Sequence, residues 1–165
     1  QHVLSPAKIV TEMNNSISDN NESNMFVTLV VGILDLETGI LKLCNAGHNP
    51  PILIYPDGQV SYLEFKTQIF VGVVEDFKYS DEEVVLEKES KLFLYTDGVT
   101  EAENINKELY GEEKLLEMLS DNASSDVRTT VNVVVDSIAS HVKEAEASDD
   151  LTILLIQYEP GTANS

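Results

Sequence analysis

Residues 91–98 read KLFLYTDG, and this stretch is the most informative part of the chain. The apolar run from Leu92 to Tyr95 is typical of a strand buried on both faces, and the strand ends abruptly at Asp97-Gly98. Glycine permits unusual backbone torsions and lets another group approach closely. A carboxylate at the end of a rigid strand has a fixed position, as a metal ligand requires. Taken alone, however, the stretch is more simply explained by an ordinary Asp-Gly turn.

A second pair of carboxylates, Asp149-Asp150, precedes another apolar run, so it lies at the start of an expected strand. Two carboxylates about 4 Å apart repel by roughly 4 kcal/mol at an effective dielectric of 20. A hard cation removes this repulsion, and oxygen-only ligands favour Mg²⁺, Mn²⁺ or Ca²⁺ over zinc. A solvated acidic loop explains the same residues, so the residue types alone leave both interpretations open.

The remaining pattern predicts antiparallel strands, then helices, then a last strand, in an α+β domain. We expect a helix that begins at Ser5-Pro6 with an apolar stripe of Val10, Met13 and Ile17. The expected strands are 25–36 and 40–46 joined by a hairpin at 37–39, then 52–55, 60–63, 83–86, 91–96 and 151–158, with 83–86 and 91–96 forming a second hairpin. Helices are expected over 112–119 and from a cap at Ser125, with residues 160–165 as a mobile tail.

The composition excludes several classes of function. The chain has 165 residues, with 29 Asp and Glu against 10 Lys and Arg, giving a net charge of -19. Such a surface repels phosphate backbones and anionic lipid, so we expect no nucleic-acid binding and no membrane insertion. The single cysteine, Cys44, excludes an intrachain disulfide and is expected in the core. With no apolar run long enough to cross a membrane and no signal peptide, we expect a cytoplasmic protein.

Five motifs in order resemble the SpoIIE-type serine phosphatases, bacterial members of the metal-dependent protein phosphatase 2C (PPM) superfamily. The main signature is LYTDGVTEA at residues 94–102. The others are MFVTL at 25–29, NAGHNPP at 45–51, YG at 110–111 and DDLT at 149–152. The resemblance extends from Ser5 to about Tyr158. One such motif is a weak signal, but five in the family's order are specific.

The resemblance implies an α-β-β-α sandwich of two antiparallel sheets flanked by helices. It also implies a binuclear Mn²⁺ or Mg²⁺ centre, in which metal-bound water attacks phosphorus in line without a phosphoenzyme. By motif, Asp97 and Asp149 correspond to metal ligands, and Gly98 forms the metal-site turn. Asp150 stands where the family often has asparagine, so as a metal ligand it ranks below Asp97 and Asp149.

The chain departs from the family pattern in one respect. The family's Gly-Gly-Asp and Gly-Asp-x-x-Gly-x-Gly segments, which supply the bridging aspartate and a carbonyl ligand, do not occur in it. We therefore expect residues 1–159 to be a partial domain, incomplete at the N-terminus, with little or no activity by itself. Exposed sheet edges and apolar surface would then favour a homodimer.

The family's usual substrates are phosphorylated regulatory proteins such as anti-anti-sigma factors, and an upstream sensory or receiver domain is expected to regulate the enzyme. One alternative is a non-catalytic interaction module that keeps the fold. An acidic Ca²⁺-binding β-protein is a weaker alternative, because no EF-hand-like run of ligands occurs. His48 is expected to stabilise its turn through ring hydrogen bonds rather than to act in catalysis.

Overall fold

Three helices and seven strands make up the described part of the chain, which comprises residues 4–19, 21–22, 25–145 and 150–160 of a computed structural model. In chain order the elements are α1 (Pro6–Ser18), β1 (Leu29–Leu34), β2 (Ile40–Ala46), β3 (Ile52–Ile54), β4 (Val60–Tyr62), β5 (Glu82–Val85), β6 (Lys91–Tyr95), α2 (Glu112–Asp121), α3 (Val127–Val142) and β7 (Ile153–Gln157). They fall into two compact units, each with its own sheet.

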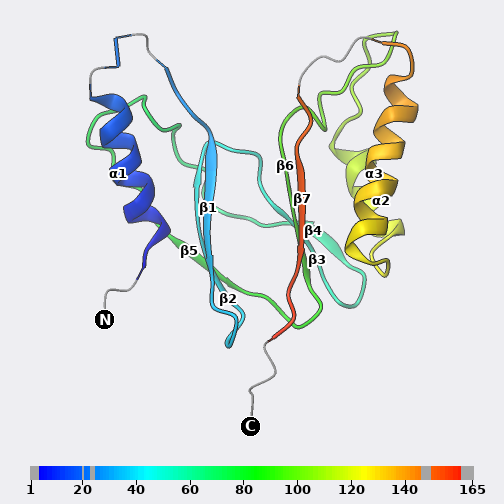
Figure 1. The fold of residues 1–165 in the computed structure, drawn as a ribbon, viewed down its shortest axis with the longest axis horizontal. Coiled ribbons are helices and arrows are strands. Elements are labelled where there is room, and N and C mark those ends of the chain that lie inside the picture. Colours follow the sequence, from blue (N-terminus) through cyan, green and yellow to red (C-terminus); the bar gives the residue numbers. More distant parts are fainter. Residues whose placement is uncertain (1–3, 20, 23–24, 146–149, 161–165) are drawn as a thin grey trace. The chain divides into compact units, whose positions relative to one another are not determined.

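The first unit, which includes the described residues up to Pro50 and Glu64–Leu86, places α1 against an antiparallel sheet in the order β1-β2-β5 (Figure 1). Helix α1 begins as the sequence predicts, because the Ser5 side chain accepts a hydrogen bond from the Lys8 amide and proline follows it. Its buried face differs from the expected stripe. Val10 is fully buried, but Met13 is 38% exposed, and Asn14 is buried in its place.

The second unit, Pro51–Leu63 and Glu87–Glu159, contains a four-stranded antiparallel sheet in the order β4-β3-β6-β7 with α2 and α3 (Figure 1). Its core joins the sheet to both helices through Phe93, Leu115 and Val134, all fully buried. The side chain that caps α3 is Asp126, which accepts from the Thr129 amide, and not Ser125 as expected.

Two strand predictions need correction. The predicted strand 25–36 is shorter, since β1 starts at Leu29 and the preceding Met25 and Phe26 are mostly exposed. The predicted hairpin of 83–86 with 91–96 does not form. Strand β5 pairs with β2 and alternates between partly buried and exposed residues, whereas β6 is almost wholly buried and pairs with β3 and β7. The two strands therefore belong to different sheets, and their different burial patterns agree with this.

The α+β class and the two antiparallel sheets flanked by helices are confirmed. The predicted hairpin at 37–39 is also confirmed, with the Asp35 amide donating to the Ile40 carbonyl at 2.9 Å. Residues 161–165 of the predicted mobile tail lie outside the described residues. No helix in the described ranges is both long enough and apolar enough to span a bilayer.

Candidate metal centre

The Asp97 turn follows a strand that has little freedom to move. β6 is hydrogen-bonded on both sides, to β3 and to β7, and four of its five residues are buried. The last pair in the register joins Tyr95 to Ile153, so the chain leaves the sheet immediately before Thr96 and Asp97. A central strand thus fixes the start of the turn, as the sequence predicts.

The Thr96 hydroxyl connects this turn to the segment that leads into β7. It accepts a hydrogen bond from the Thr152 amide at 3.1 Å and donates to the Asp150 carbonyl at 3.4 Å, while the Thr96 amide donates to the Thr152 carbonyl at 3.1 Å. The two aspartate-bearing segments are therefore adjacent at one end of the sheet. The described hydrogen bonds of Thr96 are all to backbone atoms.

Gly98 brings the two segments into direct contact. A Cβ atom built at Gly98 would overlap the Asp150 carbonyl oxygen and lie 3.1 Å from its carbonyl carbon. Because these are backbone atoms, no side-chain rotation could relieve the overlap. The sequence suggested close approach as one reason for glycine at this position, and the structure identifies the approaching group.

Hydrogen bonds within the turn fix its backbone. The Asp97 carbonyl accepts from the Glu101 amide at 2.8 Å and from the Thr100 hydroxyl at 3.3 Å. The Asp97 carboxylate accepts from the Gly98 amide at 3.0 Å, and the Asp97 side chain is exposed. The turn thus holds a solvent-accessible carboxylate on a fixed backbone.

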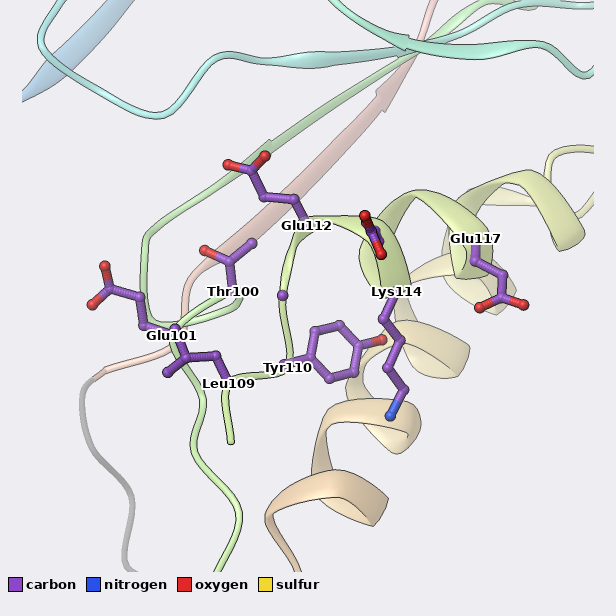
Figure 2. A pocket seen from close by; sticks show the side chains of 9 residues that line it. Thr100, Glu101, Leu109, Tyr110, Glu112, Lys114 and Glu117 are labelled. Atoms are coloured by element: carbon purple, nitrogen blue, oxygen red, sulfur yellow. The ribbon is translucent and has the colours of Figure 1, made fainter. Parts of the chain in front are cut away.

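Beside this turn lies an open hollow of about 790 Å³ at the start of α2 (Figure 2). Its lining contains four glutamates and one lysine: Glu101, Glu112, Glu113, Glu117 and Lys114. The Lys114 ammonium lies 4.9 Å from the centre of the Tyr110 ring, where it makes a cation–π contact. The excess of carboxylates makes the hollow favourable for cations.

The partly buried phenol of Tyr62, on β4, lies close to Tyr95 at the end of β6 and to Glu112 at the start of α2. Burial raises the pKa of Tyr62 well above its usual range, and the neighbouring Tyr95 and Glu112 raise it further. Tyr62 therefore stays protonated. Sequence reasoning did not connect these three residues, because Tyr95 lies in the Asp97 motif whereas Tyr62 and Glu112 are far from it in the chain.

The predicted site residues are placed as follows. Asp97 is exposed and Gly98 is buried. Asp150 is also exposed, and its backbone carbonyl lies against Gly98. Asp149 lies outside the described residues.

The donor chemistry fits a hard cation, because Asp97 and Asp150 offer oxygen atoms only. Within the described ranges, no group of three His, Cys, Asp or Glu side chains is arranged to hold a metal ion. The described residues therefore do not form a complete metal site, and the metal-ligand role of Asp97 and Asp150 stays a prediction.

His48 and Cys44, both in the first unit, have structural positions. The His48 ring nitrogen Nδ1 lies 3.2 Å from the Thr28 hydroxyl, and the His48 backbone exchanges two hydrogen bonds with the Asn45 side chain. The ring therefore makes a hydrogen bond, but to Thr28 outside the turn, and the turn itself is closed by the His48 backbone and Asn45 rather than by ring hydrogen bonds as predicted. Cys44 is 1% exposed and belongs to the core of this unit, as expected.

Comparison with known proteins identifies the family. The model of the family described as Stage II sporulation protein E (SpoIIE) matches residues 1–159. The chain therefore belongs to the SpoIIE family, which confirms the resemblance drawn from its five motifs.

Among curated relatives, Protein IcfG of Synechocystis sp. (strain ATCC 27184 / PCC 6803 / Kazusa) is 27% identical over 84% of this chain and 22% of its own length. Phosphoserine phosphatase RsbU of Bacillus subtilis (strain 168) is 23% identical over 93% of this chain and 45% of its own length. The chain thus spans less than half the length of either relative.

Solved structures confirm the fold class. The SiaA-PP2C domain of Pseudomonas aeruginosa matches with a TM-score of 0.80 and 21% identity, over 94% of this chain and 61% of that chain. RsbX in complex with magnesium matches with a TM-score of 0.62 and 19% identity, over 91% of this chain and 63% of that chain. At these identities the likeness concerns the fold.

Proposed function

We propose that the chain is part of a metal-dependent protein serine/threonine phosphatase, a phosphoric monoester hydrolase. One observation carries this proposal. In a member of the SpoIIE family, the Asp97 turn is fixed by a central strand and meets the Asp150 segment in backbone contact at Gly98. A rigid carboxylate beside a second acidic segment is the arrangement that phosphate-hydrolysing metal sites need.

Asp97 and Asp149 are the proposed ligands of Mn²⁺ or Mg²⁺, with Asp150 of second rank. The relative RsbX is described in complex with magnesium, which supports a hard cation. When bound, such a pair of ions supplies an activated water and neutralises charge on the phosphoryl oxygens. Thr96 and Gly98 hold the Asp97 turn against the backbone of residues 150–152, and the acidic hollow raises the local cation concentration.

The proposed substrate is a phosphoserine or phosphothreonine of a regulatory protein, such as an anti-anti-sigma factor. Its support is the relative RsbU, which is described as a phosphoserine phosphatase. An upstream sensory or receiver domain and a homodimer belong to the same proposal. The curated relatives are more than twice as long as this chain, which is consistent with additional regulatory segments.

The test is Mn²⁺-dependent hydrolysis of a phosphoserine peptide by the natural protein that contains this chain, at its full length. Because loss of a residue that merely orients a ligand typically costs 10–100-fold, loss of a ligand should lower kcat/KM by more than roughly 100-fold. We expect this loss for Asp97→Asn and for Asp149→Asn.

Asp136→Asn is the matched control, since Asp136 is an exposed aspartate on α3 in the same unit. It should leave kcat/KM unchanged. If the full-length protein binds its phosphorylated partner but hydrolyses no phosphoserine peptide with Mn²⁺ or Mg²⁺, the non-catalytic module is the correct interpretation. The 165 residues alone, assayed in parallel, should show little or no turnover.

A further inference from the structure

A group of apolar side chains in the first unit faces solvent where two segments of the chain meet. The MFVTL motif at 25–29 contributes one segment, and residues 70–74 contribute the other. Each member of the group is between 41% and 67% exposed. The members of this apolar platform are Met25, Phe26, Val27, Phe70, Val73 and Val74. The proposed phosphatase chemistry gives none of them a role.

Direct contacts join the two segments into one surface. The Phe26 and Phe70 rings stack with their centroids 5.3 Å apart. Val27 and Val71 exchange two backbone hydrogen bonds, each of 3.0 Å. Single exposed apolar residues are normal on a protein surface, whereas a joined group of them is typical of an interaction site.

The backbone beneath the platform is fixed before any partner binds. Asn21 Nδ2 donates to the Met25 carbonyl at 2.6 Å and to the Gly72 carbonyl at 3.1 Å. The fully buried Asn14 of α1 accepts from the Gly72 amide and donates to the Val74 carbonyl, both at 2.9 Å. A preorganised surface loses less conformational entropy on binding than a mobile one.

The rim of the platform is acidic. Glu75 and Asp76 are both exposed, and they directly follow Val74 in the chain. Asp19, at the C-terminal end of α1, is also exposed and lines one small hollow of about 190 Å³ together with them. These carboxylates give the surface beside the apolar side chains a negative charge.

The surrounding sequence adds almost no positive charge. No Lys or Arg occurs between residues 9 and 41, and Lys78 is the only one between residues 67 and 87. A second copy of the chain would bring an identical acidic rim, and anionic lipid or nucleic acid would bring phosphates, so all three are repelled. A protein segment that surrounds its apolar side chains with Lys or Arg is attracted instead. The proposed homodimer therefore uses another surface.

We propose that the apolar platform binds an amphipathic basic segment of a partner protein. Met25, Phe26 and Phe70 form its centre, in agreement with the enrichment of aromatic and methionine side chains at interface cores. The acidic rim selects the charge of the partner and accelerates the encounter at low salt. Binding requires no metal ion, so the proposal does not rest on the phosphatase activity.

The test is binding of a fluorescent amphipathic peptide of leucine and lysine to the 165-residue chain, followed by anisotropy and by backbone amide NMR shifts. We expect saturable binding that weakens with added salt, with shifts at the amides of Met25, Phe26 and residues 70–75. Two control peptides should not bind, one with glutamate in place of lysine and one with serine in place of leucine. Asp97→Asn should leave the affinity unchanged, which separates the platform from the proposed metal centre.

Matched variants decide whether the platform is the binding surface. Phe26→Ala should weaken binding by on the order of tenfold, as loss of an aromatic anchor does at other interfaces. Val73→Ser should weaken it several-fold, whereas Val85→Ser, which replaces an exposed valine on β5 of the same unit, should not. Glu75→Gln combined with Asp76→Asn should reduce the salt dependence.

Several results would overturn the proposal. No saturable binding, or equal affinity of the wild type, Phe26→Ala and Val73→Ser, would show attraction by net charge only. A mass that rises with concentration in the wild type but not in Phe26→Ala would show that a second copy occupies the platform. Binding to phosphatidylserine vesicles that Phe26→Ala abolishes would show a membrane surface. Peptide binding by the 165 residues but not by the natural protein at full length would show that another part of the same chain covers the platform.

Discussion

Replacing Gly98 by alanine tests whether the contact between the Asp97 turn and the Asp150 segment is required. The added Cβ would overlap the Asp150 carbonyl oxygen, and neither backbone can move without disturbing a hydrogen-bonded strand. Gly98 is not among the glycines with positive φ, so the effect is steric and not torsional. Overpacking of this kind costs about 1–3 kcal/mol.

Urea unfolding followed by circular dichroism would measure this loss of stability. The same variant should bind Mn²⁺ on the order of tenfold more weakly, because it displaces residues that orient a proposed ligand.

Gly32→Ala is the control for the added methyl group. At Gly32 a Cβ would meet the end of the Leu43 side chain, which can rotate away, so its stability should change by less than about 1 kcal/mol. If Gly98→Ala has the stability and Mn²⁺ affinity of the wild type, the close approach has no structural importance and this part of the account is wrong.

Three further predictions concern buried polar groups. Burial raises the pKa of the Cys44 thiol to about 11 from its usual 9.0. The contribution of the protonated thiol to stability is therefore present below pH 9.0 and is lost as the pH rises through about 11. Urea unfolding across this pH range would detect the loss. Lys91→Met should destabilise the protein by about 1–3 kcal/mol, because Lys91 Nζ donates to the Ala123 and Ser125 carbonyls, and thermal unfolding would measure this. Asn14→Ala should cost about 2–4 kcal/mol and increase amide exchange near Gly72, measured by hydrogen exchange.

Each of these predictions has a control. Cys44→Ala should lose the fall in stability between pH 9.0 and about 11. Lys88→Met replaces a lysine that is 63% exposed, so it should leave stability nearly unchanged. Asn15→Ala, next to Asn14, should cost less than Asn14→Ala, because the Asn15 side-chain oxygen has no hydrogen-bond partner to lose. If a variant and its control change stability equally, the contact assigned to that residue does not cause the change.

The sequence was sufficient for most elements because their signals are local. Ser5-Pro6 predicts the start of α1, and the apolar run before Asp97 predicts a buried strand, and both are confirmed. Strand pairing is less local. The partner of β5 depends on burial in three dimensions, so neighbouring strands in the sequence were wrongly joined into a hairpin.

The candidate site shows the same division between local and long-range information. Asp97 and Gly98 could be singled out because strand, turn and carboxylate are consecutive. The Tyr62 hydroxyl beside Tyr95 and Glu112 could not, because only folding brings β4, β6 and α2 together.

The most direct test of the central claim is Mn²⁺ binding to the 165-residue chain, measured from the free-ion signal in electron paramagnetic resonance. The account predicts weak binding that both Asp97→Asn and Asp149→Asn reduce, while the control Asp136→Asn leaves it unchanged. If all three variants bind Mn²⁺ as the wild type does, Asp97 and Asp149 are not metal ligands, and the proposed phosphatase centre is contradicted.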